Sequence, residues 1–113
     1  MRLAIIGSRS FSNYELLKES VLKSFPNVSL IVSGGAKGAD RLGEKLADEL
    51  NLRTEIFLPD WARYGKGAGL VRNELIIKNS EGVIAFWDGI SKGTKKSIEI
   101  SRSLKKKIVV VKV

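Results

Sequence analysis

The segment Leu30-Ile31-Val32-Ser33-Gly34-Gly35-Ala36-Lys37-Gly38-Ala39-Asp40 decides the fold of this chain. Its apolar start predicts a strand, its glycines predict a sharp turn, and the residues from Ala39 onward predict a helix. A strand that runs directly into a helix leaves backbone N–H groups and the positive end of the helix dipole available to an anion. Because they lack a side chain, Gly34, Gly35 and Gly38 let a ligand approach the backbone closely. We interpret the turn as a phosphate or nucleotide site; the alternative is a tight turn that needs glycine for its geometry alone.

Strands and helices alternate along the rest of the chain. Mostly apolar strands separated by amphipathic helices are typical of a parallel sheet that is covered on both faces. We therefore expect one α/β domain over residues 1–113, a Rossmann-like three-layer arrangement with a mainly parallel sheet of about five strands. The predicted strands are 2–6, 29–33, 53–58, 82–86 and 107–111, and the predicted helices are 12–24, 39–50, 70–78 and 93–104.

Cysteine and histidine are both absent from the chain. Without cysteine, disulfides and thiolate chemistry are excluded. Without histidine, the commonest general base and a common zinc ligand are missing, so we expect no metal site and infer no cofactor. No stretch is long and apolar enough to span a membrane and no signal peptide is evident, so the expected location is the cytoplasm.

Most of the net charge of +8 is concentrated near the end of the chain. Between Lys92 and Lys112 there are eight lysine and arginine residues and one acid, Glu99. Such a segment either binds a polyanion such as nucleic acid or forms a solvated face that keeps the protein in solution. The sequence leaves both interpretations open.

Polar or glycine-containing segments follow the first four predicted strands. Gly7-Ser8-Arg9, after the first strand, supplies a hydroxyl and a guanidinium suited to phosphate. Its spacing matches neither the dinucleotide fingerprint nor the P-loop. Because ligands bind beyond the carboxyl ends of strands in open parallel sheets, we expect these segments to gather at one edge. Further candidates there are Asp40, Arg72, Asn73, Asp88, Gly93 and Thr94.

Structural roles compete with ligand roles at several of these positions. Asp40 either complements the helix dipole or binds the ligand or a neighbouring loop, and Asp88 either closes a turn or contacts a ribose hydroxyl. Residues 59–69, rich in glycine and aromatic side chains, are expected to form an irregular loop. Within it, Trp61 either stacks on a base or packs beneath the loop as a small core of its own.

The order of these motifs is itself informative. They are Gly7-Ser8-Arg9, Ser33 to Asp40, Pro59 to Lys66, Ala68 to Asn73, and Phe86 to Thr94. Together they resemble the YspA-type branch of the SLOG superfamily, named after the DNA-processing protein Smf/DprA and the phosphoribohydrolase LOG. The resemblance covers nearly the whole chain. It implies a Rossmann-like domain that binds a nucleotide or nucleotide derivative, with a sensor role and a homodimer as further implications.

The resemblance also assigns a ligand-binding edge. Carried over residue by residue, that edge consists of Gly7, Ser8, Arg9, Gly34, Gly35, Gly38, Asp40, Arg72, Asn73, Asp88, Gly93 and Thr94.

Two other activities follow from the same superfamily. An N-glycosidic nucleotide hydrolase like LOG is the first, with Arg72 as a phosphate clamp and Asp88 or Glu99 as the acid. LOG enzymes carry a glutamate shortly after a Gly-Thr pair, whereas here the corresponding position is Ser97, which weakens this alternative. The second is DprA-like binding of single-stranded DNA through the basic segment from Lys92 to Lys112.

Overall fold

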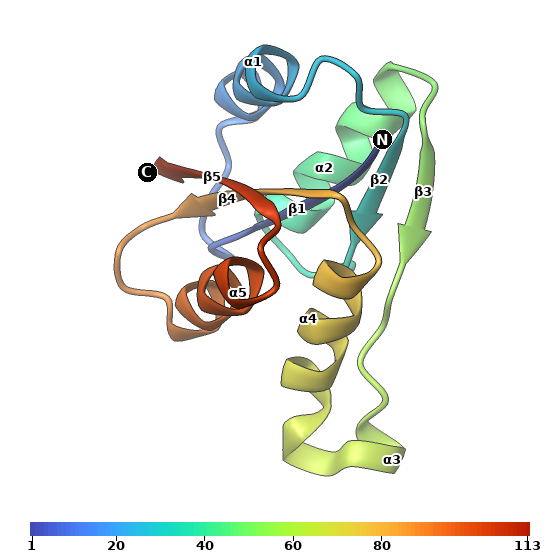
Figure 1. Ribbon diagram of the computed structural model, residues 1–113, viewed down its shortest axis with the longest axis vertical. Helices are drawn as coiled ribbons and strands as arrows, with labels where there is room; N and C mark the ends of the chain where they lie inside the picture. The colour runs from blue at the N-terminus through green and yellow to red at the C-terminus, as the bar shows by residue number, and fades with distance from the viewer.

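Five parallel strands form the central sheet of the computed structural model, which describes residues 1–113 (Figure 1). Every neighbouring pair of strands is parallel, and the strand order is β3-β2-β1-β4-β5. This arrangement confirms the predicted Rossmann-like α/β fold. The strands are β1 (Arg2–Gly7), β2 (Leu30–Ser33), β3 (Arg53–Ile56), β4 (Gly82–Trp87) and β5 (Lys107–Lys112).

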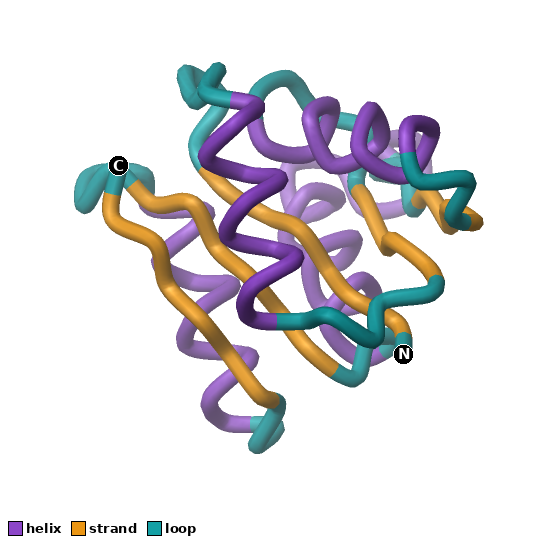
Figure 2. Tube along the Cα trace, turned by 90° about the horizontal axis from the view of Figure 1, so that it is seen from above, coloured by secondary structure: helices purple, strands orange, loops and turns teal.

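Helices cover both faces of this sheet (Figure 2). Because side chains alternate along a strand, β1 supplies both cores: Leu3 and Ile5 on one face, Ala4 and Ile6 on the other. The first pair packs with α1 (Tyr14–Ser24) and α2 (Ala39–Glu49). The second pair packs with α4 (Ala68–Lys78) and α5 (Lys92–Ser103).

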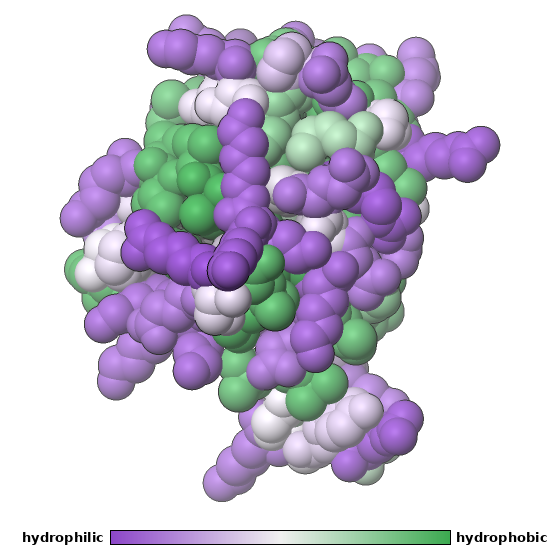
Figure 3. Space-filling view, in the orientation of Figure 1, coloured by the Kyte–Doolittle hydropathy of each residue, from purple (hydrophilic) through white to green (hydrophobic).

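The segment predicted to be an irregular loop is helical instead. It contains a short helix, α3 (Trp61–Tyr64), and a 3-10 turn, η1 (Gly65–Gly67), which leads directly into α4. The Asp60 carboxylate accepts a hydrogen bond from Arg63 N at 3.1 Å and so caps the first turn of α3. Aspartate at this position favours the start of a helix, whereas the glycines that follow favour a loop. The segment projects from the body of the molecule (Figures 1 and 3), and Trp61 is 58% exposed. Trp61 therefore does not pack beneath a loop.

None of the helices combines the length and the apolar character that crossing a bilayer would require.

Candidate functional site

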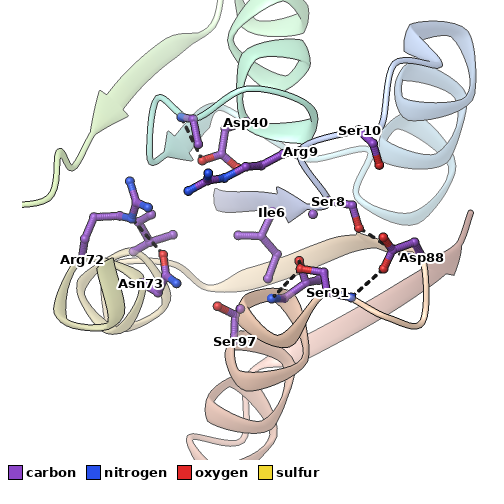
Figure 4. Close-up of a pocket in the computed structure, with 15 residues that line it drawn as sticks. Ile6, Ser8, Arg9, Ser10, Asp40, Arg72, Asn73, Asp88, Ser91 and Ser97 are labelled. Atoms are coloured by element: carbon purple, nitrogen blue, oxygen red, sulfur yellow. Dashed lines mark hydrogen bonds between the residues drawn. The ribbon is translucent and has the colours of Figure 1, made fainter. Parts of the chain in front are cut away.

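A cleft of about 500 Å³ opens where the strand order reverses, between the carboxyl ends of β1 and β4 (Figure 4). This is the place at which open α/β sheets bind ligands. The end of β1 and residues that follow β1, β2 and β4 form part of the wall, and residues of α2, α4 and α5 complete it. The lining consists of Ile6, Gly7, Ser8, Arg9, Ser10, Ala36, Asp40, Arg72, Asn73, Ile76, Asp88, Ser91, Gly93, Thr94 and Ser97.

Two arginines from different elements face this cleft. Arg9 follows β1 and Arg72 lies on α4, and neither forms a salt bridge. Arg72 donates from Nη1 to Gly34 O and from Nε to Asn73 Oδ1, each at 2.8 Å. These bonds fix the guanidinium while Nη2 stays available. Burial lowers the pKa of Arg72, the Asp40 carboxylate opposes that effect, and the nearby positive charge of Arg9 adds to it.

The beginning of α5 closes the opposite side of the cleft. Ser91 caps the helix by accepting a hydrogen bond from Thr94 N, whereas the N–H groups of Lys92 and Gly93 donate to no protein acceptor. A Cβ on Gly93 would meet nothing within 4 Å, so its backbone is open to the cleft. Buried hydroxyls of Thr94 and Ser97 continue this polar surface. The amino end of α5 thus offers backbone N–H groups and hydroxyls to the cleft and contributes no charged side chain to its lining.

Asp40 is the buried acid of the site, with 8% of its surface exposed. Its Oδ2 accepts a hydrogen bond from Ala36 N at 3.3 Å. Burial raises the pKa of the carboxyl to about 6, although the Ala36 N–H and the charge of Arg72 oppose the shift. The glycine turn before α2 therefore already holds an anion, which is the chain's own carboxylate.

The glycines of that turn bring loops together and do not line the cleft. A Cβ on Gly34 would lie 2.8 Å from both Arg72 Nη1 and Asp40 Oδ2. A Cβ on Gly38, whose φ is +83°, would lie 2.3 Å from the carbonyl oxygen of Ser8. Glycine is thus required for the close packing of the turn against the β1 loop and Arg72.

Asp88 is held at the junction of three segments. Its backbone N–H donates to Ser8 Oγ at 3.3 Å, which links the β4 loop to the β1 loop. Its Oδ1 accepts hydrogen bonds from the N–H groups of Ile90 and Ser91, both at 2.8 Å. The bond from Ser91, then the bond from Ile90, lower the pKa of the carboxyl, so Asp88 is ionised at neutral pH.

Most of the residues predicted from the sequence meet at the cleft. The structure brings together Gly7, Ser8, Arg9, Asp40, Arg72, Asn73, Asp88, Gly93 and Thr94. Four predicted residues lie outside its lining: Gly34, Gly35, Gly38 and the exposed Glu99.

Three serines that line the cleft, Ser10, Ser91 and Ser97, were not among the predicted ligand-binding residues. Ser91 precedes Thr94 by three residues, and this spacing is typical of a helix N-cap, which was a usable signal. Ser97 follows Thr94 by one helical turn and therefore shares its face. Ser10 and Ala36 line the cleft through loop geometry, for which the sequence carries no periodic signal.

The basic segment lies apart from this lining. The basic side chains between Lys92 and Lys112 lie on or beside α5 and β5, all of them exposed except the half-buried Lys106, and none of them lines the cleft. Two of them contact aromatic rings: Lys107 lies over Phe25 at 5.0 Å and Lys112 over Trp87 at 5.7 Å. These two lysines have a structural role in addition to their charge.

Comparison with known proteins agrees with this architecture. The chain is 32% identical over 104 residues to the Gene 61 protein of Mycobacterium phage D29, an alignment covering 83% of this chain and 82% of that protein. Its fold matches DNA processing protein A (DprA) from Streptococcus pneumoniae with a TM-score of 0.79 and 20% identity. That match covers 96% of this chain but 49% of the DprA chain, so the chain spans about half of its length. The signature of the family described as YspA, cpYpsA-related SLOG matches residues 1–64. The resemblance noted in the sequence is confirmed: the chain belongs to the YspA, cpYpsA-related SLOG family.

Proposed function

We propose that the cleft binds a nucleotide or nucleotide-derived ligand through its phosphate group. The observation that carries this proposal is the pair of guanidiniums, Arg9 and Arg72, that face one polar cleft and form no salt bridge; the carboxylate of Asp40 acts on Arg72 from beyond salt-bridge distance. Two like charges held near each other are relieved by an anion between them. A phosphate has the charge and the oxygen geometry that arginine binds best.

The start of α5 supports the same ligand. The N–H groups of Lys92 and Gly93 lack acceptors, and the dipole of this helix favours a negative charge at its amino end. The hydroxyls of Ser91 and Thr94 lie beside them. A phosphate in the cleft would thus receive charge from the arginines and hydrogen bonds from the helix.

Family membership supports a nucleotide- or nucleic-acid-related function in general terms. The LOG-like hydrolase has less support, because Glu99 is exposed outside the cleft and Ser97 lines it instead, which leaves Asp88 as the one candidate acid that lines the cleft. DprA-like DNA binding through the basic segment also has less support, because those lysines do not line the cleft. The nucleotide site is therefore the function that the geometry favours.

Thermal unfolding with a panel of phosphate compounds tests the proposal. The panel contains nucleoside monophosphates, cyclic nucleotides, NAD, ADP-ribose, ribose 5-phosphate and a short single-stranded DNA. A compound that binds only the folded state raises the melting temperature. We expect a nucleotide to raise it in the wild type and in Arg102→Ala, and not in Arg72→Ala. Arg102 is the matched control because it is an exposed arginine on α5 outside the cleft. A shift produced by DNA alone, and removed by salt, would overturn the proposal in favour of the basic segment.

A further inference from the structure

A second recess, of about 450 Å³, adjoins the cleft at the start of α1. The two cavities share Ser10 and Asp88, so a ligand in the cleft can continue into the recess without leaving the protein surface. The walls of the recess are Phe11, Leu16 and Val113, and its rim carries Ser12 and Asn13.

The chemistry of the recess differs from that of the cleft. No lysine or arginine lines it, and its one charged side chain, that of Asp88, is an acid, so the recess does not suit an anion. Phe11 is 7% exposed, and its ring stacks on Phe86 with a centroid separation of 4.9 Å and an interplanar angle of 12°. The stacking fixes one wall of the recess. A flat, uncharged and largely apolar group fits such a surface best.

Polar groups at the rim complement the edge of such a ring. The Ser12 hydroxyl makes no hydrogen bond within the protein. Asn13 uses Oδ1 to cap α1 by accepting from Leu16 N at 3.1 Å, which leaves its side-chain NH₂ able to donate. The recess thus offers donors and an acceptor at its rim and apolar surface within.

Asp88 lies where the two cavities meet. Its Oδ1 is occupied by Ile90 N and Ser91 N, and the second carboxylate oxygen is left for Ser8 or for a ligand hydroxyl. A cation-lined half, a carboxylate at the junction and an apolar half follow one another in that order. Phosphate, ribose and base follow one another in the same order in a nucleotide.

We propose that this recess binds the base of the nucleotide whose phosphate lies between Arg9 and Arg72. The inference rests on the proposed function and deepens it, because it assigns the ligand class as a nucleoside phosphate rather than a sugar phosphate. Contact with the apolar surface of Leu16, Val113 and the small exposed part of Phe11 supplies the affinity for the base, and Ser12 and Asn13 contact its polar edge.

Calorimetric titration with AMP, GMP, CMP, UMP and ribose 5-phosphate tests the assignment. We expect the tightest nucleotide to bind the wild type at least tenfold more tightly than ribose 5-phosphate, because only the nucleotide fills the recess. In Leu16→Ala its affinity should fall about tenfold, with ribose 5-phosphate changed less than twofold. Leu16→Met should retain the wild-type preference, and Leu22→Ala, an exposed leucine on the same helix, is the control.

A second variant covers the case in which Leu16→Ala fails to fold. Ser12 is exposed and outside the core, so Ser12→Phe fills the recess without disturbing the packing, and should abolish the preference for the nucleotide. If the variants weaken nucleotide and ribose 5-phosphate equally, or weaken neither, the base lies elsewhere and the inference is wrong. If the wild type binds none of the five compounds, the proposed function itself has failed.

Discussion

Arg72 Nη1 donates a hydrogen bond of 2.8 Å to the carbonyl oxygen of Gly34, and so joins α4 to the carboxyl end of β2. The same guanidinium donates from Nε to Asn73 Oδ1. With two of its donors fixed by the protein, Arg72 presents the remainder to the cleft in a single orientation. A preorganised donor loses less side-chain entropy when an anion binds.

The planar guanidinium of Arg72 should therefore contribute to nucleotide affinity through its geometry as well as its charge. Arg72→Lys keeps the charge but loses the planar set of donors, so nucleotide affinity should fall roughly tenfold, which corresponds to about 1.4 kcal/mol. Isothermal titration calorimetry of the wild type and the variant measures this difference, and Arg102→Lys serves as the control. Equal affinity in Arg72→Lys and wild type would show that only the charge contributes.

Gly38 should prove essential to the stability of the turn before α2. In Gly38→Ala the new Cβ would meet Ser8 O at 2.3 Å, and φ is +83°, so the free energy of unfolding should fall by roughly 2–4 kcal/mol. At Gly67, where φ is −83° and a Cβ would meet nothing within 4 Å, alanine should be neutral or slightly stabilising. Urea unfolding of both variants checks this, and equal stabilities would contradict the packing described for Gly38.

The contrast between these two glycines shows what the sequence could and could not reveal. Alternation of apolar strands with helices predicted the parallel sheet, because burial on both faces leaves a periodic signal. The glycines before α2 predicted a special turn, but not whether a ligand or a side chain would occupy it. That outcome depends on Asp40 and on Arg72, which comes from a helix more than 30 residues later in the chain.

Local sequence signals were also insufficient to predict the structure around α3. Glycines 65, 67 and 69 favoured an irregular loop, but the N-cap at Asp60 starts a short helix there.

Glu99 was a candidate acid by its position in the sequence, yet the helical period places Ser97 at the cleft and Glu99 outside it. Distinguishing the two required knowing which face of α5 packs on the sheet.

Asp40 should make the stability of the protein fall as pH rises from about 4 to 6. The carboxyl has its ordinary pKa of 3.8 in the unfolded chain, whereas burial raises the pKa to about 6 in the folded protein. Protonated Asp40 therefore contributes fully to the free energy of unfolding below pH 3.8. This contribution, up to about 3 kcal/mol, is lost as the pH rises through 6. Urea unfolding from pH 4 to 7 should show Asp40→Asn gaining stability over wild type across this window. Asp48→Asn, an exposed acid on the same helix, is the control; parallel pH profiles for Asp40→Asn and wild type would contradict the shift.

The two acids proposed as catalytic candidates should behave differently in binding. Glu99→Gln should leave nucleotide affinity unchanged within twofold, because this side chain is exposed outside the cleft. Asp88→Asn preserves an oxygen for Ile90 N and Ser91 N but removes the charge near the ribose position, so affinity should fall several-fold. Fluorescence or calorimetric titration compares the two. A larger loss in Glu99→Gln would place the ligand on the outer face of α5.

Chemical-shift mapping by NMR tests the central claim most directly, because it reports where a ligand binds without any substitution. Titrating a nucleoside monophosphate into the labelled protein should shift the backbone amides of Ser8, Arg9, Asn73 and Gly93, which come from three separate segments of the chain and line the same cleft. Shifts confined to amides of β5 and the residues before it, from Lys105 to Lys112, or no shifts at millimolar nucleotide, would contradict the account.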